Sequence, residues 1–301
     1  MYFISKMNDL ISAFENKLII SKPNLITLKA KNNTEQSKIV LQNISNGAKC
    51  SENGNKYEKL IWNNLKNTTI NNEKFNTQTE LELGGSTSHN DIICNFNSKI
   101  KNISIEIKNT ICAEFIQMDV HKEGDKWVGP RITRKSHPLS VINRYLIEIN
   151  SQKDLYYGNL PPLNKTRKEF DEWQEWLKKK KKEVKEDNDD NEDNDNTKDT
   201  KDYFWKSRDP NFIKNNYKDK GCSYIQINKY GLYHLGEDIC NFDVPEFKPD
   251  DITLRLRCKR RGSKGCVPSS ITMSAYISGL VKSKYSLDMI DNLPENLIYK
   301  I

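Results

Sequence analysis

The chain has 301 residues, of which 36% are hydrophobic and 30% charged, and its net charge is +7. It contains no apolar run near the roughly 20 residues of a membrane span, and its N-terminus lacks the pattern of a secretion signal. These features argue against a membrane protein and a secreted one. The odd count of seven cysteines then predicts reduced thiols and an intracellular protein, in the cytoplasm, the nucleus or a viral factory.

The charges are distributed unevenly along the chain. Residues 183–202 hold 10 acidic and 3 lysine side chains, which leaves a net charge of +14 on the rest. A basic body favours a polyanionic partner, most simply DNA, although lysine-rich surfaces also serve solubility. The acidic tract has too little apolar surface to fold, so we predict a disordered insertion, with masking of the basic surface as a second interpretation.

The first elements along the chain are predicted to be two helices and a strand. Apolar residues recur at helical spacing over residues 4–18 and again over residues 57–65, where Glu58 lies beside the apolar stripe. Residues 77–83 are expected to form a strand that enters a bend at Gly84-Gly85.

Two apolar runs after this bend predict an antiparallel hairpin. In residues 103–108 the isoleucines occupy one face of a strand, and Glu106 and Lys108 occupy the other. If the chain turns near Ser98-Lys99, Asp91 lies opposite Glu106. Two carboxylates and one amine then converge on one patch of a sheet, an arrangement suited to a divalent metal and a water nucleophile.

At these residues the chain resembles the PD-(D/E)XK nuclease superfamily, which has the restriction-endonuclease-like fold. The family motif is an Asp, a variable gap and then acid-x-Lys on the next strand. The match is Asp91 followed by Glu106-Ile107-Lys108, with Asn90 where the family usually has Pro. The resemblance covers roughly residues 54–120.

Two further residues match features of some family members. Many members carry a Glu on an earlier helix, which Glu58 matches. Some place a Gln on the helix after the Lys, and Gln117 matches this because residues 111–120 are predicted to be a helix. The expected order of helix, three strands and helix agrees with the core of that fold.

The resemblance implies an α/β fold, a restriction-endonuclease-like mixed sheet flanked by helices, and a Mg²⁺-dependent endonuclease that hydrolyses DNA, with Mn²⁺ as a substitute. Asp91, Glu106 and the carbonyl of Ile107 would bind the metal, with Glu58 as an auxiliary ligand. Lys108 would orient the attacking water and stabilise negative charge. Cutting both strands of a duplex would favour a homodimer.

Two alternatives remain open at this point. The chain could be a catalytically inactive nucleic-acid-binding protein on the same fold. It could also be an interaction protein in which Glu106 and Lys108 form only a ladder of solvated surface charges.

The middle of the chain is expected to form a loop, a strand and a helix. Residues 128–144 contain helix-breaking Gly-Pro and His-Pro pairs and predict a phosphate-contacting loop. Residues 140–149 are interpreted as a buried element, in our prediction a strand, and residues 165–182 as a helix. The candidate phosphate contacts in the loop are Arg131, Arg134 and Lys135.

The C-terminal part is predicted to be β-rich. Residues 224–235 predict a hairpin, and residues 252–257 a strand that leads into a basic turn. The expected nucleic-acid contacts here are Arg255, Arg257, Lys259, Arg260, Arg261 and Lys264. A structural zinc site is an alternative for Cys222, Cys240, Cys258 and Cys266.

The sequence therefore suggests three parts. Residues 1–177 would form the nuclease-like core, and residues 178–202 the lysine run and acidic insertion. Residues 203–301 would complete the core or form a separate recognition lobe.

Overall fold

The structure is a computed structural model that describes residues 35–66, 68–70, 73–77, 91–96, 100–130, 137–187, 201–260, 268–289 and 298–300. The chain divides into two units, Met1–Glu52 and Asn53–Ile301. The first is described only where helix α3 (Glu35–Lys66) begins, so the account below concerns the second. The predicted helix at residues 4–18, the Gly84-Gly85 bend and all of the predicted strand at residues 77–83 except Thr77 lie outside the described residues.

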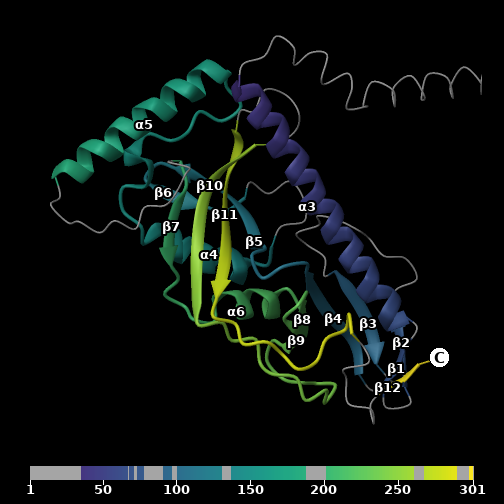
Figure 1. Ribbon diagram of the computed structural model, residues 1–301. Coiled ribbons are helices and arrows are strands. Elements are labelled where there is room, and N and C mark those ends of the chain that lie inside the picture. The colour runs from purple at the N-terminus through teal and green to yellow at the C-terminus, as the bar shows by residue number, and fades with distance from the viewer. Residues whose placement is uncertain are drawn as a thin grey trace, which may run out of the picture. The chain divides into compact units, whose positions relative to one another are not determined.

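The second unit is a mixed α/β structure built on two sheets, which Figure 1 shows together with the helices. The first sheet has seven strands in the order β12-β1-β2-β3-β4-β8-β9. Its strands are β1 (Thr68–Ile70), β2 (Glu73–Thr77), β3 (Ile92–Phe96), β4 (Ile100–Lys108), β8 (Tyr224–Ile227), β9 (Gly231–His234) and β12 (Ile298–Lys300).

The second sheet has five strands in the order β6-β5-β11-β10-β7. These are β5 (Phe115–Glu123), β6 (Lys126–Val128), β7 (Tyr203–Lys206), β10 (Asp251–Arg260) and β11 (Pro268–Ser278). Both sheets draw strands from either side of the acidic tract, so residues 203–301 add β8, β9 and β12 to the first sheet and three strands to the second.

Four α-helices accompany the sheets in the described residues, and each contributes to one of two apolar cores. Helix α3 packs Tyr57, Ile61 and Leu65 against the isoleucines of β3 and β4. The other core lies between the second sheet and the opposite face of β8. It takes buried residues from the remaining helices, which are α4 (Leu139–Asn150), α5 (Arg167–Asp187) and α6 (Phe212–Asp219).

The predicted hairpin is confirmed. Strands β3 and β4 pair antiparallel with Ile92 opposite Ile105, and the register shifts between Cys94 and Phe96. Because Ile92, Ile103, Ile105 and Ile107 are buried in the core with α3, the alternate positions of both strands face the opposite side of the sheet.

Strand β4 also pairs with β8, and this pair is parallel. A parallel pair needs a crossover, and here the crossover is long. It contains β5, β6, α4, α5, β7 and, directly before β8, helix α6. Helix α6 lies on the sheet face that carries Glu106, because Tyr217 contributes to the core that also contains Ile225 of β8.

Two predicted elements are wrong. Residues 111–120, predicted to be a helix, enter strand β5, and residues 140–149, predicted to be a strand, form helix α4. In β5, Met118 and Val120 are buried and alternate with half-exposed Gln117 and Asp119, which is the pattern of a strand. In α4, Val141, Tyr145 and Ile149 are buried at the four-residue spacing of a helix.

Other predicted elements are confirmed. They are the helix at residues 57–65, the helix at residues 165–182, the hairpin of β8 and β9 and the strand at residues 252–257. Helix α5 continues to Asp187, so the start of the acidic tract is helical, and residues 188–200 lie outside the described part. None of the helices in the described ranges combines the length and apolarity that crossing a membrane would require.

Candidate active site

The β3–β4 hairpin brings Asp91, Glu106 and Lys108 together. The carboxylate oxygen Oδ2 of Asp91 accepts a hydrogen bond from the Ile107 backbone N–H at 2.7 Å. The Lys108 ammonium donates to Oε1 of Glu106 at 2.5 Å. Glu106 is only 4% exposed, so this pair is shielded from water and interacts strongly.

Helix α6 adds residues that the sequence analysis did not select. Lys220, just after this helix, places its ammonium 3.7 Å from Oε2 of Glu106. The ammonium groups of Lys108 and Lys220 lie 5.8 Å and 5.2 Å from the centre of the Tyr217 ring. Glu106 therefore faces one lysine on each of its two carboxylate oxygens.

The pKa of Asp91 is higher than that of an ordinary aspartate. Burial and the negative charges of Glu106 and Glu58 raise its pKa to about 7, against the opposing effects of Lys108 and the Ile107 N–H. Near neutral pH Asp91 is therefore only partly ionised, because its carboxylate is buried beside other carboxylates. A further cation would stabilise the ionised form of Asp91.

Glu106 and Lys108 hold each other in their charged forms. Burial opposes ionisation of Glu106, but the positive charges of Lys108 and Lys220 outweigh it and lower the Glu106 pKa. Burial also opposes protonation of Lys108, but Glu106 and Asp91 raise its pKa above the ordinary value. Lys108 is thus an ammonium group at neutral pH.

Glu58 lies on α3 within electrostatic range of this pair. Burial raises its pKa, Lys108 lowers it and Glu106 raises it further. Since it interacts with both members of the Glu106–Lys108 pair, Glu58 is the third carboxylate around the site, as its place in the motif predicted.

Gln117 is oriented differently from the prediction. Its side chain donates to Glu114 at 2.6 Å and accepts from Lys259 at 2.5 Å on the second sheet. Its backbone carbonyl accepts from Nε2 of His137 at 2.9 Å. Because that nitrogen carries the ring proton, Nδ1 of His137 presents a lone pair, which is buried without a hydrogen-bond partner in the described part of the chain.

The oxygen atoms of the site fit a divalent metal only in part. Within the described ranges, no group of three or more Asp, Glu, His or Cys side chains is arranged to hold a metal ion. Mg²⁺ is commonly bound by one or two carboxylates together with waters and substrate phosphates. Asp91 and Glu106 supply two carboxylates, and Oε2 of Glu106 is a buried acceptor without a hydrogen bond from any of the residues that the structure describes. The residues therefore fit Mg²⁺ bound together with a phosphate, but not a metal enclosed by protein ligands alone.

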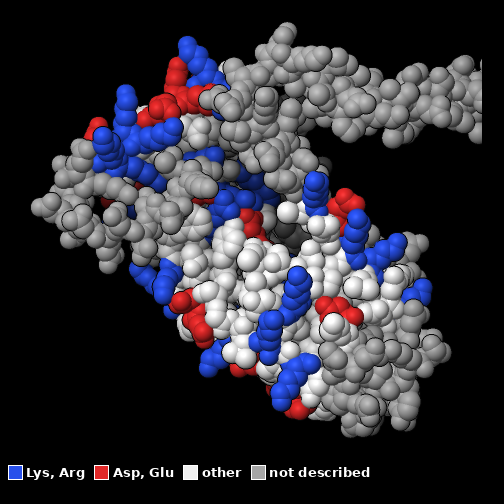
Figure 2. All heavy atoms as spheres, viewed as in Figure 1, with Lys and Arg blue, Asp and Glu red and all other residues white. Residues whose placement is uncertain are grey.

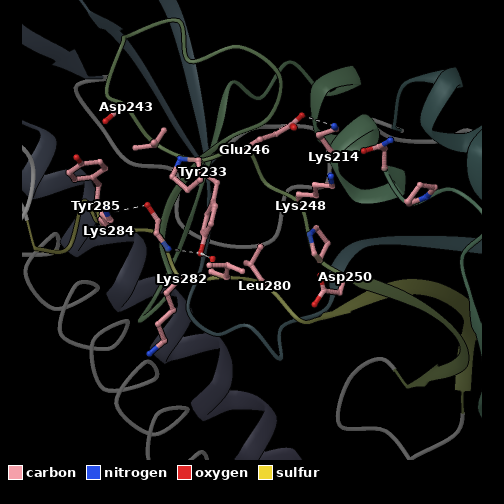
Figure 3. Close-up of a pocket in the computed structure, with 17 residues that line it drawn as sticks. Lys214, Tyr233, Asp243, Glu246, Lys248, Asp250, Leu280, Lys282, Lys284 and Tyr285 are labelled. Atoms are coloured by element: carbon pink, nitrogen blue, oxygen red, sulfur yellow. Dashed lines mark hydrogen bonds and ion pairs between the residues drawn. The ribbon is translucent and has the colours of Figure 1, made fainter.

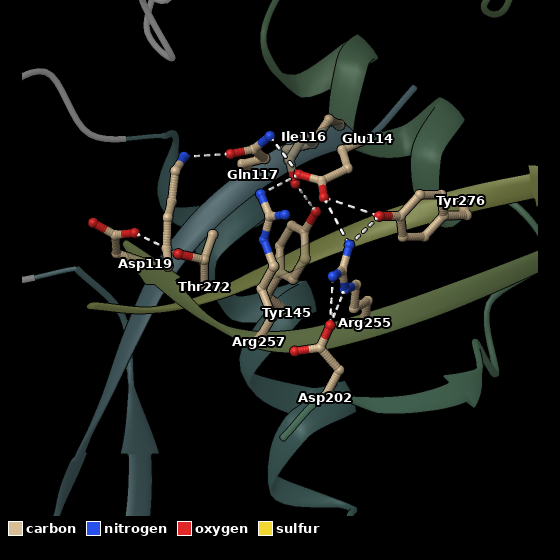
Figure 4. Close-up of polar contacts among 11 residues, drawn as sticks. Glu114, Ile116, Gln117, Asp119, Tyr145, Asp202, Arg255, Arg257, Thr272 and Tyr276 are labelled. Carbon is tan, nitrogen blue, oxygen red and sulfur yellow. Dashed lines mark hydrogen bonds and ion pairs between the residues drawn. The ribbon is translucent and has the colours of Figure 1, made fainter. Parts of the chain in front are cut away.

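The basic residues predicted to contact DNA on β10 are engaged within the protein. Figure 4 shows Arg255 and Arg257 directed at Glu114, at distances of 3.1 Å and 2.7 Å. Arg255 also binds Asp202 and the Tyr276 hydroxyl. These guanidinium groups hold β10 to the loop before β5, which leaves them less available to a phosphate than the prediction requires.

The remaining residues of the predicted nucleic-acid and zinc sites lie largely outside the described part of the chain. Arg131, Arg134, Lys135, Arg261, Lys264 and Cys266 lie outside the described residues, and for Arg260 only the backbone is described. Figure 2 shows lysine and acidic side chains side by side over helix α5, where Lys178 and Lys180 pair with Glu175 and Glu183. The charge on that face is mixed rather than uniformly positive.

A cavity of about 1170 Å³ opens beside β9, away from the residues described above. Figure 3 shows Tyr233 and Tyr285 in it, with Lys248, Lys282 and Lys284 around it. Neither Asp91, Glu106 nor Lys108 lines this cavity. Acidic residues line the cavity as well, so the charge of its lining does not indicate a particular ligand.

The cysteines give no support to a zinc site in the described ranges. Cys94, Cys222, Cys240 and Cys258 are all buried. Cys222 and Cys258 belong to one apolar core, and Cys94 and Cys240 belong to the other.

Comparison with known proteins leaves the family open, because no family model, no curated protein and no solved structure matches this chain. The site therefore has to be judged on its own geometry. The sequence located Glu58, Asp91, Glu106 and Lys108, but it missed Lys220, Tyr217 and His137. No local motif marks these three, since the long crossover brings them to the hairpin.

Proposed function

We propose that this chain is a Mg²⁺-dependent endonuclease with a restriction-endonuclease-like core that hydrolyses phosphodiester bonds of DNA. The observation that carries the proposal is the convergence of Asp91, Glu106 and Lys108 on one face of the β3–β4 hairpin. The raised pKa of Asp91, which results from burial and from the neighbouring carboxylates, supports it, since a divalent cation would stabilise the ionised form.

Each residue has a defined role in this proposal. Asp91 and Glu106 hold the metal, with the Ile107 carbonyl as a further oxygen ligand, and Glu58 adds negative charge beside them. A bound Mg²⁺ lowers the pKa of a coordinated water and neutralises charge on the phosphate. Lys108, which its carboxylate neighbours keep protonated, orients the attacking water and stabilises the negative charge that develops on the phosphate.

The fold gives partial support to the finer assignment. Helix α3 is followed by strands β1, β2, β3 and β4, one strand more than the resemblance implies. The helix expected directly after the Lys strand is replaced by β5, and the helix that packs on the Glu106 face, α6, follows a long insertion. In the proposed core, a long insertion therefore separates the Lys108 strand from the helix that packs on it.

One observation favours a second candidate, a nucleic-acid-binding protein without catalytic activity. The charge of Glu106 is already balanced by Lys108 and Lys220 without a metal. Such a protein would keep salt-sensitive affinity for DNA but show no metal-dependent cleavage.

The test is cleavage of supercoiled plasmid and of single-stranded DNA by the full chain with Mg²⁺, Mn²⁺ or EDTA. The parent is compared with Lys108→Ala and with Lys206→Ala, a control lysine whose side chain is 76% exposed. We expect metal-dependent cleavage that Lys108→Ala lowers by about 100-fold or more and that the control retains. Equal cleavage by the parent and Lys108→Ala would refute the proposed site, and binding without cleavage would favour the second candidate.

A further inference from the structure

The position of Lys220 is unusual for a lysine. Its side chain is only 8% exposed, whereas lysines are almost never buried unless they are paired. Its ammonium lies 3.7 Å from Oε2 of Glu106, which is an ion pair but longer than a hydrogen bond. That oxygen has no hydrogen-bond partner in the described part of the chain, so Lys220 is the cation that faces it.

Each of the two lysines interacts with a different oxygen of the Glu106 carboxylate. Lys108 takes Oε1 through a short hydrogen bond, and Lys220 faces Oε2. Both ammonium groups are near the ring of Tyr217, which comes from the same helix end as Lys220. Lys108 is fixed on a strand, whereas Lys220 follows α6 and is held to Glu106 by the looser of the two contacts.

A metal on Glu106 and the Lys220 ammonium would compete for the same oxygen. Two cations at one carboxylate oxygen repel each other, strongly so in a shielded site. The lysine stem has four flexible carbons, and an ammonium is a good point-charge ligand for phosphate. When a metal occupies Oε2, Lys220 can therefore shift toward the phosphate that the metal brings with it.

We propose that Lys220 is a positioning residue of the metal site, which occupies Oε2 of Glu106 in the metal-free protein and is transferred to the substrate phosphate when a divalent cation binds. This inference rests on the proposed nuclease function. It predicts that the Lys220 charge has opposite effects on two measurable quantities. It weakens the binding of the metal alone, and it speeds cleavage once the metal is saturating.

The test uses Lys220→Met, which keeps a long apolar stem against Tyr217 and removes the charge. Lys220→Gln is the second neutral variant, in case the first does not fold, and Lys220→Arg retains the charge. Lys218→Met is the control, because Lys218 is an exposed lysine at the end of the same helix. Binding of Mn²⁺ alone is measured by calorimetry, and plasmid cleavage is measured at saturating Mn²⁺.

We expect the neutral variants to bind Mn²⁺ about 5-fold more tightly or more, the usual lower range for coupling between two ligands of one site. We also expect them to cleave about 10-fold more slowly in kcat. Lys220→Arg and Lys218→Met should resemble the parent in both measurements. A purely structural role for Lys220 would instead weaken metal binding and cleavage together.

Unchanged or weaker Mn²⁺ binding in folded neutral variants would overturn the role of Lys220 while leaving the proposed function intact. A parent that binds no Mn²⁺, or binds it equally well as Glu106→Gln, would overturn both this inference and the assignment of the metal site. The two failures are therefore distinguishable.

Discussion

The β3–β4 hairpin and the polar face of the second sheet carry the same kinds of side chains but differ in their balance of charge. Around Glu106, three carboxylates meet two ammonium groups, and the Asp91 pKa is raised, first by burial and further by its carboxylate neighbours. Around Glu114, two guanidinium groups meet Glu114 and Asp202, and both acids are ion-paired.

The comparison separates a candidate reaction centre from a structural network. Balanced and hydrogen-bonded charges hold β5, β10 and β11 together and need no ligand. By contrast, carboxylates that outnumber the cations on one face repel one another, and a bound cation would weaken that repulsion. An alternating charged strand in the sequence cannot distinguish the two cases, because the balance depends on partners from distant segments.

The largest expected effect comes from changing the acid in the hairpin. Glu106→Gln should reduce metal-dependent cleavage by about 100-fold or more, because it removes a proposed metal ligand. It should also lower the free energy of unfolding, because the buried lysines Lys108 and Lys220 lose the negative charge that they pair with. The measurement is plasmid cleavage beside a thermal melt, and full activity in a folded variant would contradict the site.

The matching change in the network should affect stability instead. Glu114→Gln removes the carboxylate that Arg257 pairs with and leaves Arg255 with Asp202 alone, so we expect unfolding to cost about 2 kcal/mol less. Urea denaturation measures this, and cleavage should remain near the parent value below the transition. A large loss of cleavage in the folded variant would show that the two regions are functionally linked.

The third expected effect is a difference in the pH dependence of stability. Because the pKa of Asp91 rises from its ordinary value near 4 to about 7 on folding, the folded chain holds this proton more tightly than the unfolded chain. The free energy of unfolding should therefore fall as pH rises across that range.

Asp91→Asn should lack this part of the slope and be more stable than the parent above pH 7, when both are compared in EDTA. Urea denaturation across pH 4 to 8 measures the difference. Glu172→Gln, at an exposed position on α5, is the control. Identical slopes for the parent and Asp91→Asn would show that Asp91 is not in the electrostatic environment described here.

The sequence predicted the hairpin and its register because both are local properties. Alternating isoleucines define one face, and the short connection between the runs fixes which residues oppose each other. This was enough to place Asp91, Glu106 and Lys108 together. Glu58 followed from an apolar helical stripe, which depends only on spacing within the helix.

The errors arose where the local pattern was ambiguous. In β5, Phe115 and Ile116 are both buried, and Ile116 has a positive φ of 44°, so the alternation of a strand is interrupted at its start. In α4, β-branched residues favoured a strand although the buried residues follow helical spacing. The contacts of Arg255 and Arg257 were missed because Glu114 lies far away in the sequence.

The long crossover between β4 and β8 has a consequence for how the molecule folds. Asp91 and Glu106 belong to one hairpin, a local structure of the kind that forms in microseconds. Lys220 reaches them only after β4 pairs with β8, which places Ile105 beside Tyr224. The chain between these two residues contains strands β5, β6 and β7 of the second sheet. Closing so long a loop is slow. During folding the two carboxylates should thus come together first, and for a period Lys220 should not yet contact the Glu106 oxygen that we propose as a metal ligand.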